Sequence, residues 1–233
     1  MKILIIIPAY NEAENIERTI RDIYEHCTNV DCLVVNDCST DNTEQIINVL
    51  GVDYMSLPIN LGIGGGVQAG YRYAVRHGYD IAVQFDGDGQ HMAEYIQVIT
   101  APIEDGEANV VIGSRFIDKQ GFQSSAMRRF GISFLSRLIQ LLCGVRVMDV
   151  TSGFRAVDKK MIHYFAENYA QDYPEPEAIL ASGCYGAVIR EVSVQMRERM
   201  GGTSSITPVK SIYYMIKVSL ALLLSRITQK KEL

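Results

Sequence analysis

The sequence predicts an α/β protein with a mostly parallel central sheet flanked by helices. Short apolar runs alternate with longer segments whose apolar residues recur every three or four positions, the patterns of strands and helices. Polar loops rich in glycine follow several of the apolar runs. Strands that alternate with helices form parallel sheets through right-handed crossovers. Ligands of such sheets bind where the carboxyl ends of the strands meet, so we expect a site there.

The N-terminal half supplies four strands and the helices between them. The predicted strands cover 2–7, 31–35, 52–57 and 81–83. Asn11 is expected to cap the first helix, and Asp41 with Glu44 resembles a capping arrangement for the second. The first and third helices show apolar faces at helical spacing, formed by Ile16, Ile20, Ile23 and Cys27 and by Val67, Tyr71, Ala74 and Val75.

The C-terminal half continues the pattern less regularly. We expect a strand at 109–112, an amphipathic segment at 128–143, a helix at 158–168, an acidic turn at 172–177 followed by a helical run, a strand at 188–196 and a loop at 197–205. No internal repeat or low-complexity linker is visible. The prediction is therefore one domain, residues 1–210, with an amphipathic C-terminal helix and tail, residues 211–233.

The C-terminal segment allows two interpretations. Its apolar band between 211 and 226 is interrupted by Lys217, whereas a bilayer-spanning helix needs about 20 consecutive apolar residues. Lysines and an arginine surround the band, which favours a helix lying in a membrane interface and attracted by anionic lipid. A helix that packs on the protein's own core, or on a partner, explains the same pattern.

Composition limits the class of protein. The 233 residues are enough for one large domain, and 48% hydrophobic and 21% charged residues are ordinary for a globular protein. Met1-Lys2 is followed by only five apolar residues before Pro8, too few for a signal peptide. Five cysteines without a C-x-x-C pair indicate reduced thiols. We therefore expect a cytoplasmic protein.

Charge is distributed unevenly along the chain. The overall net charge is −5, yet residues 1–114 carry five basic and 17 acidic residues. Residues 115–155 and 196–233 each carry seven basic and two acidic residues. Basic segments on an acidic body predict anionic partners at those two places. A nucleic acid is not expected, because the chain is acidic overall and shows no nucleic-acid-binding motif.

Two aspartates stand one residue apart at the end of the fourth predicted strand. Asp86 and Asp88 lie in the stretch Gln84–His91, with a glycine after each. Carboxylates this close repel each other unless a cation or hydrogen-bond donors lie between them. Oxygen ligands suit Mg²⁺ or Mn²⁺, which in turn bind diphosphates. A solvated Asp-Gly turn is the alternative, but the position at a strand end favours a metal and nucleotide site.

A run of glycines precedes the third helix, and it excludes two common nucleotide-binding classes. Gly62 and Gly64–Gly66 form neither G-x-G-x-x-G after the first strand nor G-x-x-x-x-G-K-[ST]. A dinucleotide-binding Rossmann domain and a P-loop NTPase are therefore poor interpretations. The glycines either line a ligand or only permit a tight turn from strand to helix.

Taken in order, the motifs resemble those of family 2 glycosyltransferases with the GT-A fold, in particular the polyprenyl-phosphate sugar transferases related to dolichyl-phosphate mannose synthase. The motifs are Ile7–Glu12, Asn36–Asp41, Asn60-x-Gly62, Asp86-x-Asp88-x-Gln90, Gly113–Arg115, Ser152–Arg155 and Arg199-x-x-Gly202-x-Ser204. The resemblance implies a GT-A domain that transfers a hexose from a nucleotide diphosphate sugar, with inversion and with Mg²⁺ or Mn²⁺. UDP is expected as the nucleotide in preference to GDP.

The resemblance also implies roles for individual residues. The nucleotide would be bound by Pro8, Ala9, Tyr10, Glu12, Asp37, Asn60, Gly62, Asp86 and Gly87. The metal would be bound by Asp86, Asp88 and Gln90, and Arg199 would close on the diphosphate. Two departures stand out: the usual D-D-G-S-T-D loop is Asn36–Asp41 here, and Ser205 replaces a lysine that would contact a phosphate.

The acceptor implied by the resemblance is a polyprenyl phosphate at the inner face of the membrane, contacted by Arg115, Arg129 and Ser133, with Arg115 also counted among the catalytic residues. The protein would then be peripheral on that face, alone or with a separate membrane protein. A sugar hydroxyl is the alternative acceptor. It would need a base, for which Glu175 or Glu177 stands where many members have an E-D pair.

Two other classes are weighed against these enzymes. The same fold could serve as a nucleotide-sugar-binding scaffold without turnover, although intact Asp86, Asp88, Gln90 and Arg199 argue against it. A nucleotidyltransferase would need a glycine-rich basic loop after the first strand, where this chain has Pro-Ala-Tyr-Asn-Glu.

Overall fold

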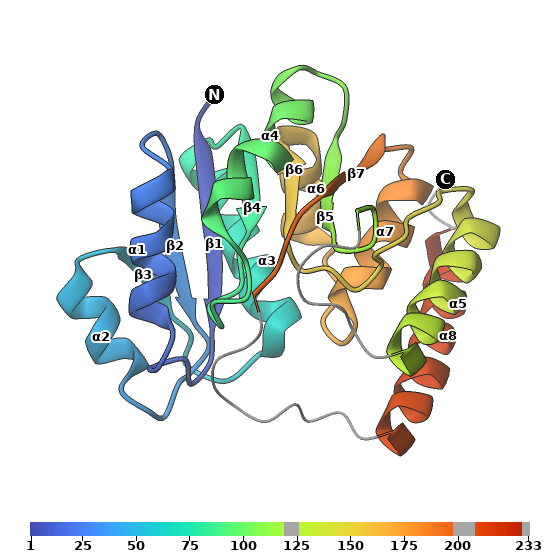
Figure 1. The fold of residues 1–233 in the computed structure, drawn as a ribbon, viewed down its shortest axis with the longest axis horizontal. Helices are drawn as coiled ribbons and strands as arrows, with labels where there is room; N and C mark the ends of the chain where they lie inside the picture. Colours follow the sequence, from blue (N-terminus) through green and yellow to red (C-terminus); the bar gives the residue numbers. More distant parts are fainter. Residues whose placement is uncertain (119–125, 198–207, 230–233) are drawn as a thin grey trace.

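The computed structural model describes residues 1–118, 126–197 and 208–229. In these residues one seven-stranded sheet runs through the molecule (Figure 1) in the order β3-β2-β1-β4-β6-β5-β7. The strands are β1 (Ile3–Ala9), β2 (Asp31–Asn36), β3 (Asp53–Ser56), β4 (Ile81–Gln84), β5 (Val110–Ser114), β6 (Arg155–Asp158) and β7 (Ile189–Ser193). All neighbours pair in parallel except β6, which is antiparallel to both β4 and β5. The predicted mostly parallel sheet is confirmed, although β6 was not predicted.

Helices cover both faces of the sheet, and each face has its own apolar core. One core joins α1 (Ile16–His26), α2 (Thr43–Leu50) and α4 (Ile96–Glu104), which follows the short 3-10 helix η1 (Ala93–Tyr95). The other joins α3 (Gly62–His77), α5 (Ala126–Cys143), α6 (Lys159–Glu167), α7 (Pro174–Cys184) and α8 (Pro208–Gln229). Strand residues alternate between the two cores: Leu4 and Ile6 face one, and Ile5 and Ile7 face the other.

The predicted caps of the first two helices are wrong in detail. α1 begins at Ile16, and Asn11 lies in the preceding loop with φ 55°. The Asn11 side-chain oxygen accepts a hydrogen bond from the Thr40 N–H at 2.8 Å. Asp41 does accept from the Thr43 N–H at 2.9 Å, but Glu44 accepts from Ser56 and closes no capping box. The Asn11 bond therefore joins the loop after β1 to the loop after β2.

The acidic segment at 172–177 does not form a separate turn. Helix α7 begins at Pro174, so Glu175 and Glu177 lie in its first turn. Proline is tolerated there because the first N–H groups of a helix have no partner within it, and acidic residues are favoured by the helix dipole.

Helix α8 packs on the C-terminal half of the predicted domain through one face. It contacts α7 and α5, and it lies beside α5 at one end of the molecule (Figure 1). Val218 and Leu222 are fully buried in the shared core. Among the described residues, no helix is long and apolar enough to span a bilayer. The structure thus supports packing on the protein's own core, while Leu220 and Leu224 stay exposed on the outer face.

Replacing Leu222 by alanine tests this packing. The change leaves a cavity in the core where α8 packs on α5 and α7, so the free energy of unfolding should fall by about 2–5 kcal/mol in a urea titration. Leu224→Ala is the matched control on the exposed face, with an expected change within about 0.5 kcal/mol. Equal effects of the two changes would contradict the packing of α8 seen here.

Candidate active site

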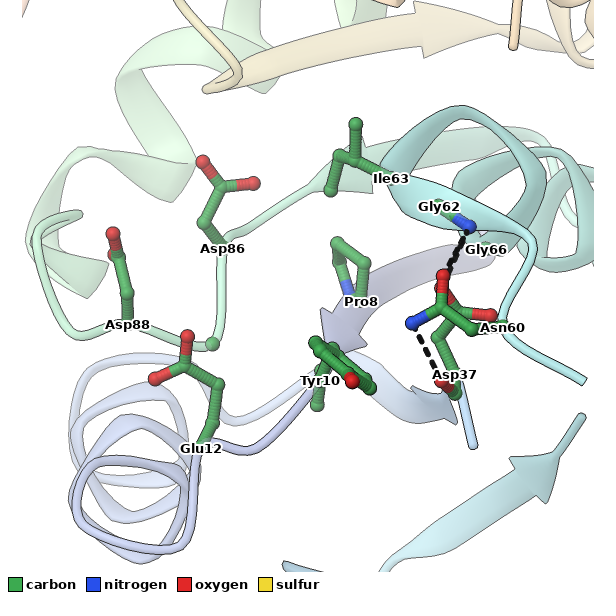
Figure 2. A pocket seen from close by; sticks show the side chains of 12 residues that line it. Pro8, Tyr10, Glu12, Asp37, Asn60, Gly62, Ile63, Gly66, Asp86 and Asp88 are labelled. Carbon is green, nitrogen blue, oxygen red and sulfur yellow. Dashed lines mark hydrogen bonds between the residues drawn. The ribbon is translucent and has the colours of Figure 1, made fainter. Parts of the chain in front are cut away.

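A pocket of about 410 Å³ opens at the carboxyl ends of β1, β2 and β4. It is lined by Pro8, Ala9, Tyr10, Glu12, Asp37, Asn60, Gly62, Ile63, Gly66, Asp86, Gly87 and Asp88. All nine residues predicted for the nucleotide are therefore brought together, although they come from four separate segments of the chain. Figure 2 shows Asp86, Asp88 and Glu12 on one side of the pocket, and Asp37 and Asn60 on the other.

Asp37 joins the end of β2 to the start of α3. One carboxylate oxygen accepts from the Leu61 N–H at 2.7 Å, and the other accepts from the Gly62 N–H at 2.8 Å. The Asp37 carbonyl also accepts from the Asn60 side-chain amide at 3.2 Å. Asp37 is buried, but each carboxylate oxygen has a second lone pair. The residue can therefore hold this turn and still accept a hydrogen bond from a nucleotide base.

The glycine run combines the two functions left open by the sequence. Gly62 and Gly66 line the pocket. Gly62 has φ 75°, which favours glycine at the turn into α3. Gly64 instead allows close packing, because a Cβ there would lie 2.3 Å from the Ala170 carbonyl oxygen.

The carboxylate of Asp86 is held by polar neighbours on two sides. Its Oδ1 accepts from the Gln84 amide at 3.1 Å, and its Oδ2 lies 3.6 Å from Nε2 of His91. The Asp86 N–H donates to Nδ1 of His91 at 3.0 Å. Nδ1 thus accepts a hydrogen bond, so the proton of the neutral imidazole lies on Nε2, which faces Asp86. Burial lowers the pKa of His91, which favours this neutral form.

His91 contacts Asp86 at the first pocket, although no role was predicted for it from the sequence. The side chain is buried and stacks on Phe154 with ring centroids 4.8 Å apart. Its distance of five residues from Asp86, within one glycine-rich loop, was the available signal. The orientation of His91 depends on its stacking against Phe154, which lies in the loop before β6. The sequence around His91 does not reveal this contact.

The residues present fit a hard divalent cation. Asp86 and Asp88 both line the pocket, and the Gln90 N–H donates to Asp88 Oδ1 at 3.0 Å. Within the described ranges, no group of three or more His, Cys, Asp or Glu side chains is placed to hold a metal ion. Mg²⁺ needs no such cage, since it binds through one or two carboxylates, waters and substrate phosphates. The Gln90 side chain donates to the Arg197 carbonyl at 3.5 Å, and its role as a ligand stays a prediction.

A second pocket of about 480 Å³ lies along α5. It is lined by Phe116, Arg129, Ile132, Ser133, Ser136, Arg137, Gln140, Arg146 and Met148, and so contains two of the three predicted acceptor residues. The third, Arg115, is buried and does not line it. Its guanidinium makes two 2.7 Å hydrogen bonds to the fully buried carboxylate of Asp149. This ion pair fixes the chain just before Phe116, and contact of Arg115 with an acceptor stays a prediction.

The remaining candidates occupy different surroundings. Burial raises the pKa of Glu175, against the opposing charge of Arg155, and the Glu175 carbonyl accepts from Arg155 at 3.3 Å. Burial also raises the pKa of Glu177, whose carboxylate accepts from Ser225 of α8 at 2.9 Å. Glu177 therefore helps to hold α8. Arg199 and Ser205 lie outside the described residues.

Comparison with known proteins identifies the family of the chain. A family model described as glycosyl transferase family 2 matches residues 4–165, more than half of the sequence. The chain belongs to glycosyl transferase family 2.

Curated relatives of this family 2 glycosyltransferase include a polyprenol monophosphomannose synthase of Mycolicibacterium smegmatis, 31% identical over 68% of this chain and 62% of that protein. An undecaprenyl-phosphate mannosyltransferase of Micrococcus luteus is 31% identical over 67% of this chain and 66% of that protein. A UDP-N-acetylglucosamine–dolichyl-phosphate N-acetylglucosaminyltransferase of Methanococcus voltae is 33% identical over 71% of this chain and 72% of that protein. The match thus spans just under two thirds of the first two relatives.

Solved structures confirm the GT-A type of fold. A glucosyl-3-phosphoglycerate synthase of Mycobacterium tuberculosis in complex with phosphoglyceric acid superposes with a TM-score of 0.74, covering 97% of this chain and 79% of that one. A complex of the same enzyme with Mn²⁺, UDP and glucosyl-3-phosphoglycerate gives 0.71. At 21% identity, these likenesses establish the fold of the family 2 glycosyltransferase and not its substrates.

Two residues with positive φ near the pocket give a matched pair of stability predictions. Cys38 has φ 61° and only a 3.9 Å contact from its thiol to the Pro58 carbonyl, so Cys38→Gly should stabilise the fold by about 1 kcal/mol. Asn11, at φ 55°, bonds Thr40, so Asn11→Gly should not stabilise. Urea titrations measure both. A stabilised Asn11 variant with an unchanged Cys38 variant would refute the assignment of strain.

Gly153 is predicted to keep Asp86 in position. A Cβ at residue 153 would lie 2.7 Å from Asp86 Oδ2, so Gly153→Ala must displace the carboxylate. We expect Mn²⁺ affinity in the presence of UDP, measured by calorimetry, to fall roughly 10- to 100-fold, as for other changes beside metal ligands. Unchanged affinity in a variant with native circular dichroism would show that Gly153 does not position Asp86.

Proposed function

We propose that this protein is an inverting glycosyltransferase that moves a hexose from a nucleotide diphosphate sugar to a polyprenyl phosphate. The observation that carries the proposal is the pairing of two pockets in one family 2 domain. The first gathers the nine predicted nucleotide residues with Asp88, and the second contains Arg129 and Ser133, with no carboxylate among its described lining residues. The first suits a nucleotide diphosphate with a divalent cation, and the second suits an anionic acceptor.

The donor site would work through charge and position. Asp86 and Asp88, with Gln90, would hold Mg²⁺ or Mn²⁺, which offsets the charge that develops on the departing nucleoside diphosphate. Asp37 would accept from the base while it holds the turn into α3, and Arg199 would add positive charge at the diphosphate. UDP is proposed over GDP, supported by the UDP-named relative from Methanococcus voltae.

The acceptor site would need no general base. A phosphate monoester has its second pKa near 6, so it is largely dianionic at pH 7 and attacks without losing a proton. The site then has to attract and orient the anion. Arg129 and Ser133 line the second pocket and would bind it, and Arg115, which does not line that pocket, would be the third contact. The names of relatives from three organisms, each with a polyprenol or dolichol acceptor, support this class of acceptor.

The proposed place of action is the cytoplasmic face of the membrane, where the protein would be peripheral. A water-insoluble acceptor requires the second pocket to approach the bilayer. The exposed apolar face of α8, next to α5, supports an interfacial position, alone or beside a separate membrane protein.

A sugar hydroxyl remains the second candidate acceptor, because one observation favours it. Glu175 is a carboxyl group whose burial raises its pKa, and Asp86 raises it further. A general base works best when its pKa approaches the working pH. Glu175 would then accept the proton of the attacking hydroxyl, and the enzyme would extend a lipid-linked or polysaccharide glycan.

Incubation with Mn²⁺, radiolabelled UDP- and GDP-sugars and undecaprenyl phosphate tests the proposal. Label should enter the organic phase from one UDP-sugar, and Asp88→Asn should abolish the transfer. Donor hydrolysis without labelled lipid would move the acceptor to a hydroxyl. Nucleotide binding without turnover of any donor would instead make the protein a nucleotide-sugar-binding scaffold.

Glu175→Gln separates the two acceptors. With a lipid phosphate we expect kcat within about threefold of the wild type, since no proton has to be removed, whereas loss of an obligatory base costs about 100-fold or more. Glu177→Gln is the control, because its carboxylate bonds Ser225 of α8. A collapse of kcat confined to Glu175→Gln would contradict the lipid-phosphate mechanism.

A further inference from the structure

We propose that the outer half of the second pocket is a separate anion site, which binds the headgroup phosphate of an anionic bilayer phospholipid beside the acceptor. The site consists of Arg137, Gln140 and Arg146. The inference rests on the proposed function, because a polyprenyl phosphate is taken to occupy the end formed by Arg129 and Ser133.

The pocket has two ends because it follows the axis of α5. Arg129, Ser133, Arg137 and Gln140 recur every three or four residues, so they share one face of the helix. The helical rise of 1.5 Å per residue places Arg137 about 12 Å beyond Arg129 along the axis. One phosphate bound by Arg129 and Ser133 therefore leaves the far end for a second anion.

Arg146 joins the far end through the loop that follows α5. Helix α5 ends at Cys143, and the Ser136 hydroxyl donates to the Val147 carbonyl. This bond returns the chain to the helix and brings Arg146 to the same pocket as Arg137. Two guanidinium groups from different segments thus line one end of the pocket.

The arginines of the second pocket give its surface an excess of positive charge. In the described part of the chain, Arg129, Arg137 and Arg146 are exposed and form no ion pair. Glu191 of β7 contacts the loop after α5 through its carboxylate, which accepts hydrogen bonds from the backbone N–H groups of Met148 and Asp149 at 2.7 and 2.8 Å. Residues 119–148 contain five basic and no acidic residues, in a chain of net charge −5. Positive charge is therefore concentrated where an anion would bind.

An apolar stripe beside the arginines indicates a lipid rather than a soluble anion. Phe130, Phe134 and Leu141 are 77%, 47% and 84% exposed, and their spacing places them on the face of α5 next to the arginine row. A soluble phosphate would make no contact that requires exposed phenylalanines. A phospholipid would contact both groups, because its headgroup can pair with guanidinium groups while apolar side chains enter the acyl boundary.

Helix α8 extends this surface. A Cβ at Gly131 would lie 2.8 Å from the Met215 sulfur, so α8 packs directly against α5. Its outer face exposes Ile216, Leu220, Leu224 and Ile227. Two adjacent helices thus present exposed apolar residues, with the arginine pocket along α5.

Vesicle partitioning of the full chain, without donor or acceptor, tests the site. Sedimentation would compare phosphatidylcholine vesicles with vesicles that also contain phosphatidylglycerol, for the wild type and for Arg137→Gln/Arg146→Gln. We expect the double variant to bind the anionic vesicles about 30-fold more weakly, from about 1 kcal/mol for each basic residue at an anionic surface. The matched control is Arg76→Gln/Lys160→Gln, which removes two exposed charges from α3 and α6 and should bind like the wild type.

A second measurement separates the lipid site from the acceptor site. In a neutral detergent, KM for undecaprenyl phosphate should be the same in the wild type and in Arg137→Gln/Arg146→Gln. Equal vesicle binding by wild type and variant, or an equal loss in the control pair, would overturn the proposal. A raised KM with unchanged vesicle binding would assign both arginines to the acceptor instead. Because partitioning needs no turnover, it reads out the lipid site even if no sugar is transferred.

Discussion

The active site depends on the carboxylate of Asp37, which accepts from the N–H groups of Leu61 and Gly62 and so fixes the start of α3 against the end of β2. These two bonds hold the glycine-rich turn beside the loop after β2. The bond from Thr40 to Asn11 joins the first two loops in the same way. Because parallel strands deliver these loops to one sheet edge, a few hydrogen bonds hold together the pocket that is proposed to bind the nucleotide.

A buried ion pair has the corresponding role in the other half of the sheet, between the segment that follows β5 and the segment that precedes β6. Arg115 and Asp149 are both removed from solvent, so each would be left as a costly unpaired charge without the other. Their pairing places Phe116 and Met148 at the second pocket, where α5 supplies the exposed arginines. The molecule thus separates its charges: carboxylates gather where a cation and a nucleotide are proposed to bind, and guanidinium groups gather where lipid phosphates are.

Six of the seven strands and most of the residues that line the first pocket could be predicted from the sequence, because local patterns specify them, whereas β6 was not predicted. Apolar runs identified β1, β2 and β4, and the polar residues after them had to meet at one edge. Contacts between residues far apart in the sequence could not be predicted from these local patterns. Asn11 was taken for a helix cap because its bond to Thr40 spans 29 residues. The burial of Arg115 against Asp149 could not be predicted because the two residues are 34 positions apart. His91 was missed for the same reason, since its orientation depends on Phe154.

The proposal that a lipid phosphate is the attacking group can be tested most directly by offering two acceptors that differ only in that group. Undecaprenyl phosphate and undecaprenol would be incubated in turn with the same labelled donor and Mn²⁺, and labelled lipid would be measured. We expect transfer to the phosphate alone, because the proposed acceptor site provides positive charge in place of a base. Equal transfer to the alcohol would contradict it and would make a carboxylate such as Glu175 part of the mechanism.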